Sequence, residues 1–147
     1  MSKLFEAIKL FYQKLNPLFR IVISVLVGIA IATMVLGLAE SLNVILFPST
    51  ILNPTINEQE DLVKNAPAIE FLFILFGNMI SAFFGGYTAA RLAPLNKKLV
   101  CGFFVGFFLM LCAVFYFILI VHPIWFAIAT GLSHLLFSYL GAKLAKN

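Results

Sequence analysis

Charged side chains are scarce in this sequence: only 11% of its 147 residues are Asp, Glu, Lys or Arg. A soluble domain carries about 25%, so the chain lacks the polar surface that such a domain needs. Hydrophobic residues make up 63% of the chain, and the apolar runs exceed the roughly 18 residues that mark a membrane span. The composition therefore predicts a single membrane domain over residues 1–147, without room for a soluble catalytic module.

Cysteine is scarce as well, since Cys101 and Cys112 are the only two and both lie in one apolar run. They form no CxxC pair, so we expect neither a metal site nor a disulfide and interpret both as buried free thiols. The sequence also lacks HExxH, Gly-x-Ser-x-Gly, P-loop and paired-aspartate motifs. We therefore expect no metal and no cofactor, and enzymatic activity is not favoured.

Four apolar segments are long enough to span a membrane, over about residues 18–42, 68–92, 99–121 and 124–142. Residues 1–17 form a basic amphipathic segment, which predicts a cytoplasmic helix lying at the membrane surface. The external loop covers about residues 48–67, where Thr55 and Glu58 form a capping-box pattern that predicts a short helix. The expected fold is an all-α integral membrane protein, a four-transmembrane-helix bundle with an amphipathic N-terminal interfacial helix.

The basic residues lie almost entirely on the side of the two termini. Only Lys64 lies in the external loop. By the positive-inside rule, both termini are expected in the cytoplasm. Anionic lipids at that face are then the expected contact of these cations, and nucleic acid is not an expected partner. The nine residues on the terminal side are Lys3, Lys9, Lys14, Arg20, Arg91, Lys97, Lys98, Lys143 and Lys146.

Small residues recur every fourth position in the second apolar segment, which gives one side of the helix almost no side chain. Such faces let helix backbones approach closely in lipid. Two neighbouring columns occur, and we expect a bundle of this size to leave one of them free for a partner. A further column in the first span, Thr33, Gly37 and Ser41, has Glu40 beside it. The predicted packing residues are Gly77, Ser81, Gly85, Gly86, Ala89, Ala90, Gly102 and Gly106.

Five polar residues are candidates for a functional site, because ionisable groups inside a membrane are costly. Glu40, Glu70 and His122 fall near the external ends of their spans, whereas Asn78 and His134 fall near the middle. They are interpreted either as a polar path or as contacts between helices. In the second case, Asn78 and His134 would share a hydrogen bond between the second and fourth spans.

Three short segments carry a resemblance to known proteins: GGYTAAR at 85–91, HPIWFAI at 122–128 and YLGAKLA at 139–145. With them, the chain resembles the small four-span inner-membrane proteins of bacteria, over residues 68–147. The resemblance implies a bacterial cytoplasmic (inner) membrane location. It implies no activity and no catalytic residues.

The predicted helices have many small residues for packing and few polar residues that could come together at one site. A non-enzymatic structural or accessory module is therefore the leading hypothesis. Such a module would pack with itself, as a homo-oligomer, or with a membrane-protein partner. The alternative is a small transporter or channel lined by the five polar residues. A lipid-modifying enzyme with His122 or His134 as its base is a third hypothesis, which requires a carboxylate within hydrogen-bond reach of the histidine.

Overall fold

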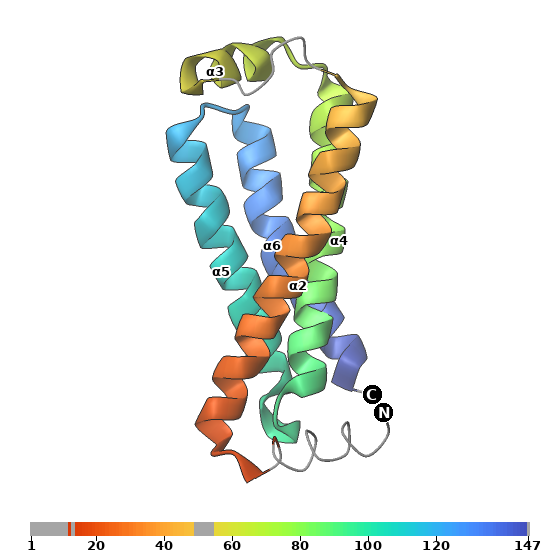
Figure 1. Ribbon diagram of the computed structural model, residues 1–147, viewed down its shortest axis with the longest axis vertical. Coiled ribbons are helices and arrows are strands. Elements are labelled where there is room, and N and C mark those ends of the chain that lie inside the picture. Colours follow the sequence, from red (N-terminus) through yellow and green to blue (C-terminus); the bar gives the residue numbers. More distant parts are fainter. Residues whose placement is uncertain (1–11, 13, 49–54, 147) are drawn as a thin grey trace.

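The structure is a computed structural model that describes residues 12, 14–48 and 55–146 (Figure 1). Within these ranges every regular element is a helix, and four helical segments are long and apolar enough to cross a membrane, as predicted. The predicted interfacial helix over residues 1–17 lies largely outside the described residues. The elements are α2 (Pro17–Leu46), α3 (Ile56–Asn65), α4 (Ala68–Leu92), the short 3₁₀ helix η1 (Leu95–Lys97), α5 (Lys98–Leu119) and α6 (Ile124–Lys146).

The helix ends follow local chemistry. Asn16 caps α2, because its Oδ1 accepts a hydrogen bond from the Leu18 amide at 3.0 Å. Both α2 and α6 run four residues beyond the predicted spans. In contrast, α5 ends two residues early, and Ile120 already has an extended backbone shortly before Pro123, which cannot continue a helix.

Helix α3 begins as its capping pattern predicts. The Glu58 carboxylate accepts hydrogen bonds from the Thr55 amide at 2.7 Å and from the Thr55 hydroxyl at 2.8 Å. These bonds favour the ionised form and hold the pKa of Glu58 below its usual 4.5. At the other end of α3, Lys64 lies 3.5 Å from the Asp61 carboxylate.

Helix α4 lies at the centre of the bundle and packs against α2, α5 and α6. In Figure 1, α3 lies across one end of the bundle, and α2 and α5 are close near the opposite end but separate toward α3. A methyl group added at Gly28 would lie 2.9 Å from Val105 Cγ2, so α2 and α5 approach where these residues meet. The contact between α2 and α5 is therefore confined, and their α3-side ends diverge.

The eight predicted packing residues are all buried. One column of α4 faces α2: a methyl group added at Gly85 would lie 2.8 Å from both Ala32 Cβ and Gly28 O. The second column faces α6, where Gly86 contacts Ser138 so closely that no added methyl group would fit. The expectation that one column of α4 stays free for a partner is wrong, because two different helices cover the two columns.

Helix α2 uses a different small-residue face from the one that the sequence emphasised. Gly28 and Ala32 are buried against α4, whereas Thr33 and Ser41 are exposed. A methyl group added at Gly37 would meet nothing within 4 Å. The column Thr33, Gly37 and Ser41 is thus an open surface of the bundle, which we call the outward α2 face.

Hydroxyl groups bind the bundle together at a few points. Ser81 donates a hydrogen bond to Ala32 O at 2.9 Å, which joins α4 to α2, and Ser138 donates to Gly102 O at 2.6 Å, which joins α6 to α5. At the end opposite α3, the Tyr12 hydroxyl lies 3.1 Å from Leu92 O. Polar bonds between helices therefore accompany the close packing of small residues.

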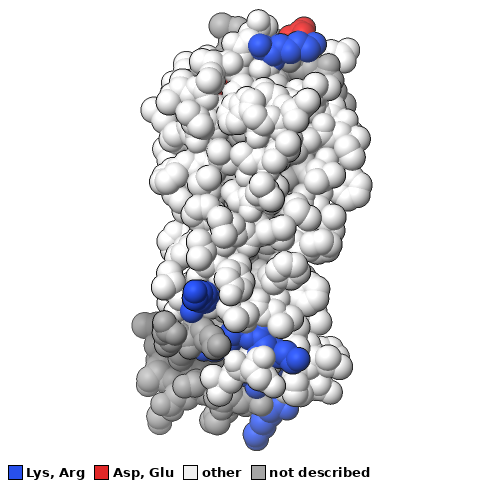
Figure 2. All heavy atoms as spheres, turned by 180° about the vertical axis from the view of Figure 1, so that it is seen from behind, with Lys and Arg blue, Asp and Glu red and all other residues white. Residues whose placement is uncertain are grey.

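On the face shown in Figure 2, charged side chains lie near the two ends of the bundle, and the surface between them is almost free of charge. We call the end opposite α3 the basic end; its cations with described side chains are Lys14, Arg20, Arg91, Lys97, Lys98 and Lys143.

The outward surfaces of all four long helices expose large hydrophobic side chains. The interpretation of both cysteines as buried is wrong for Cys112, since Cys101 is buried but Cys112 is exposed on α5. Both are free thiols. Apolar exposure on this scale is typical of a surface that faces lipid rather than water.

Candidate functional site

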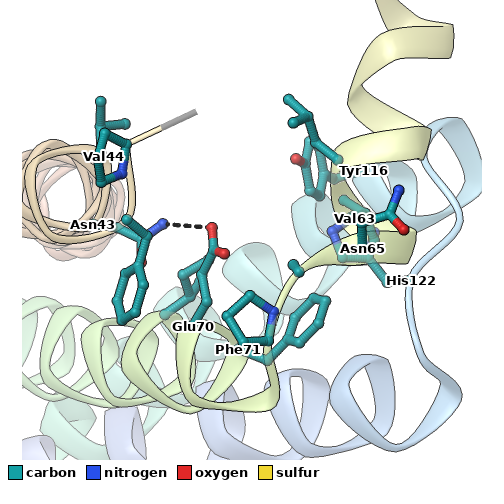
Figure 3. Close-up of a pocket in the computed structure, with 14 residues that line it drawn as sticks. Asn43, Val44, Val63, Asn65, Glu70, Phe71, Tyr116 and His122 are labelled. Atoms are coloured by element: carbon teal, nitrogen blue, oxygen red, sulfur yellow. Dashed lines mark hydrogen bonds between the residues drawn. The ribbon is translucent and has the colours of Figure 1, made fainter. Parts of the chain in front are cut away.

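A pocket of about 500 Å³ lies at the α3 end of the bundle (Figure 3). It is formed by the last turns of α2, the first turns of α4, the α3 helix, and residues at and after the end of α5. Because α2 and α5 diverge toward this end, the space between them is not closed by helix packing, and α3 lies over it. The polar residues that line it are Asn43, Asn65, Glu70, Tyr116 and His122.

Glu70 is the carboxylate of this pocket. It lies in the first turn of α4, and its Oε1 accepts a hydrogen bond from Asn43 Nδ2 at 3.2 Å, as the dashed line in Figure 3 shows. Asn43 is only 8% exposed, and its Oδ1 has no hydrogen-bond partner among the described residues. A carboxylate accepts up to about four hydrogen bonds, so this pair leaves an excess of acceptor capacity in the pocket.

His122 belongs to the same pocket but also to a cluster of aromatic rings. Its Nδ1 lies 2.7 Å from Ile120 O, and because a carbonyl oxygen only accepts, Nδ1 carries the proton of this bond. The His122 ring centroid lies 5.0 Å from that of Phe117, 5.3 Å from that of Tyr116 and 5.7 Å from that of Phe126. Ring packing and a backbone bond thus fix the imidazole in place.

Glu40 does not line the pocket. It is exposed on α2. Of the three candidates that were expected near the external ends of their spans, the structure therefore brings Glu70 and His122 into one pocket and places Glu40 outside it.

The two mid-helix candidates lie apart from the pocket. Asn78 is buried, and its Nδ2 donates to Ile74 O of its own helix at 3.0 Å. His134 is 3% exposed, and its Nδ1 lacks a hydrogen-bond partner among the residues that the structure describes. The expected bond between Asn78 and His134 is not found among those residues.

A small polar group surrounds His134 on α6. Thr130 lies one turn before it, is 2% exposed, and its hydroxyl oxygen is likewise without a partner in the described ranges. Ser133 donates to Thr130 O at 2.8 Å. A methyl group added at Gly106 would lie 2.6 Å from His134 O, so α5 closes tightly over this part of α6.

Three polar residues of the pocket were not candidates in the sequence: Asn43, Asn65 and Tyr116. Asn43 falls just beyond the predicted end of the first span, and Tyr116 was one aromatic residue among many. A signal for Asn43 does exist, because it is a polar residue in the last turns of a long apolar helix. Its partner Glu70 becomes evident only when the register of α2 against α4 is known.

Comparison of the chain with models of known protein families, with curated proteins and with solved structures gives no match. The functional argument therefore depends on the chain's own geometry.

Proposed function

We propose that the protein is a multi-pass protein of a bacterial cytoplasmic membrane, with both termini in the cytoplasm. The length of the four apolar helices and their exposed hydrophobic surfaces support this proposal. The cations of the basic end support the orientation by the positive-inside rule. That end then contacts anionic lipid headgroups, and α3 and the pocket lie on the external side.

Within the membrane, the proposed role is that of a non-enzymatic accessory module that docks a transmembrane helix of another membrane protein. The observation that carries this role is the outward α2 face with Glu40 beside it. Glu40 is exposed, and so are Thr33 and Ser41. Both small columns of α4 are occupied inside the bundle, which leaves the outward α2 face as the small-residue surface available for close approach.

The depth of Glu40 supports a partner there. The neighbouring Ala39 packs against Gly77, since a methyl group added at Gly77 would lie 2.6 Å from Ala39 Cβ. Glu40 comes six residues before Leu46, where α2 ends, which is about 9 Å along the helix axis. A carboxylate exposed at this depth is costly in lipid. A partner that brings a basic group or a hydrogen-bond donor would offset this cost.

A different protein fits this face better than a second copy of the chain. Two copies related by a twofold axis would bring the same surface of each together, and the two Glu40 carboxylates would then repel each other. The hydroxyls of Thr33 and Ser41 already donate to carbonyl groups of their own helix, at 2.9 and 2.7 Å. Glu40 is therefore the group on this face that a partner would stabilise, by a positive charge or a hydrogen bond.

The test is the size of the complex that mild detergent extracts from native membranes. Wild-type protein is expected to migrate well above the 16.3 kDa monomer in its micelle, and Gly37→Leu is expected to migrate as the monomer. Gly37→Leu fills open space and should leave the bundle folded. Gly131→Leu is the matched control, because a methyl group there makes only an ordinary contact, 3.7 Å from Met110 Cγ.

Two results would overturn this role: a monomeric wild-type protein in native membranes, or an assembly that survives Gly37→Leu. A dimer formed by the purified chain and lost in Gly37→Leu would instead assign the face to a second copy.

The other hypotheses have less support. A transporter path would need Glu40, Asn78 and His134 to share a cavity with Glu70 and His122, and only the last two line the pocket. A lipid-modifying enzyme would need a carboxylate bonded to a histidine, and no such hydrogen bond occurs within residues 14–48 and 55–146.

A further inference from the structure

The side chains that line the pocket at the α3 end carry a net negative charge. Its lining contains one carboxylate, Glu70, and neither Lys nor Arg. The nearby helix α3 adds the exposed carboxylates of Glu58 and Asp61, and its one lysine, Lys64, lies 3.5 Å from Asp61. A ligand with positive charge is therefore favoured over an anion.

The hydrogen-bonding groups of the pocket point to a donor ligand. The Asn43 amide already donates to Glu70, and the Asn65 amide donates to Asp61 O at 2.7 Å. Glu70 keeps acceptor capacity after its bond with Asn43, and Asn43 Oδ1 has no partner among the described residues. An ammonium group carries three donors and no acceptor, so it complements this set.

Aromatic rings in the lining also favour a cation as the ligand. Phe47, Phe71, Tyr116 and His122 all line the pocket, and a cation within about 6 Å of a ring face is attracted to it. The remaining lining is largely aliphatic, with Val63 and Ile74 among its members. A ligand that fits both parts is cationic at one end and apolar at the other.

We propose that this pocket binds the ammonium group of an amphiphilic primary amine, with the ammonium against Glu70 and the alkyl chain along the apolar lining. The site is separate from the outward α2 face and does not depend on the accessory role proposed above. Two sources share this chemistry: a free alkylamine that reaches the external face, and the headgroup of an ethanolamine lipid.

The full chain in phosphatidylcholine nanodiscs provides the assay. Trp125 is the single tryptophan, and its ring centroid lies 6.1 Å from that of Phe71, so its emission reports occupancy of the pocket. Hexylamine is the probe, since an alkylamine is protonated at pH 7 as lysine is. 1-Hexanol is the uncharged control, and nanodiscs without protein correct for partitioning into lipid.

Hexylamine is expected to bind saturably and about tenfold or more tightly than 1-hexanol, the range of one charge-assisted hydrogen bond. Glu70→Gln is expected to abolish this preference, whereas Asp61→Asn, which removes one charge outside the pocket, should keep it. If the wild-type protein bound the amine and the alcohol equally, this result alone would overturn the proposal. A preference that persists in Glu70→Gln would overturn it as well.

Phosphatidylethanolamine in the nanodisc separates the two sources. If the lipid headgroup is the ligand, hexylamine binding should weaken as the share of this lipid increases. If a free amine is the ligand, hexylamine binding should not change.

Discussion

Adding one methyl group at Gly85 should separate α2 from α4. In Gly85→Ala the new Cβ would lie 2.8 Å from Gly28 O and 2.8 Å from Ala32 Cβ, whereas ordinary contacts begin near 3.4 Å. The difference, 3.4 minus 2.8, means that the two helices must move apart by about 0.6 Å. Neither obstacle is a flexible side chain, so the strain cannot be relieved by a change of rotamer.

The expected loss can be estimated from known effects. Overpacking a close contact costs about 1–3 kcal/mol. Ala is favoured over Gly inside a helix by about 0.5–1 kcal/mol, and this gain applies equally at Gly37, where the added methyl group meets nothing within 4 Å. Relative to Gly37→Ala, Gly85→Ala should therefore lower the free energy of unfolding by about 1–3 kcal/mol.

The assay is reversible unfolding in mixed micelles by titration with sodium dodecyl sulfate, followed by circular dichroism. Gly37→Ala should unfold at a denaturant fraction equal to or slightly above that of the wild type, and Gly85→Ala at a clearly lower one than Gly37→Ala. Equal stability of the two alanine variants would refute the packing of α2 on this column of α4.

Three further predictions concern single contacts. Ser81→Ala removes the hydrogen bond to Ala32 O and should cost about 0.6–1 kcal/mol in the same unfolding assay; no loss at all would mean that this bond does not hold α2. Phe71→Ala empties the aromatic cluster at the α3 end and should cost about 3–5 kcal/mol; a loss below 1 kcal/mol would contradict the burial of this ring. The pKa of Glu58 is lowered by its bonds to Thr55, so their contribution to α3 is complete above about pH 4.5 and is lost as the pH falls through the folded-state pKa. NMR Cα shifts of α3 should therefore move toward random-coil values below pH 4.5, and unchanged shifts down to pH 3 would exclude this role.

The helices and the central place of α4 follow from local patterns in the sequence. A repeat of small residues every fourth position defines a bare face whatever the neighbours are, so Gly85 and Gly86 were recognisable as packing positions. The capping bond between Thr55 and Glu58 spans only three residues and is equally local.

Contacts between distant segments were not predictable in the same way. Asn43 meets Glu70 only because α2 and α4 pack in one register, which the sequence does not encode locally. The Asn78 amide donates to the Ile74 carbonyl of its own helix. The sequence did not distinguish this bond from the expected bond to His134. Which column of α4 faces which helix also depends on the whole bundle, and for this reason the expectation of a free column was wrong.

Water access along the bundle tests most directly whether the protein is a membrane-embedded bundle with a closed middle and an external pocket. Single cysteines at Asn65, Ser133 and Asn96, in a background with Cys101 and Cys112 replaced, would be treated with a membrane-impermeant thiol reagent. In intact cells the cysteine at 65 should react, that at 133 should stay protected even after lysis, and that at 96 should react only after lysis. Reaction at 133 in intact cells would reveal a water path and favour the transporter hypothesis, and reaction at 96 in intact cells would contradict the proposed orientation.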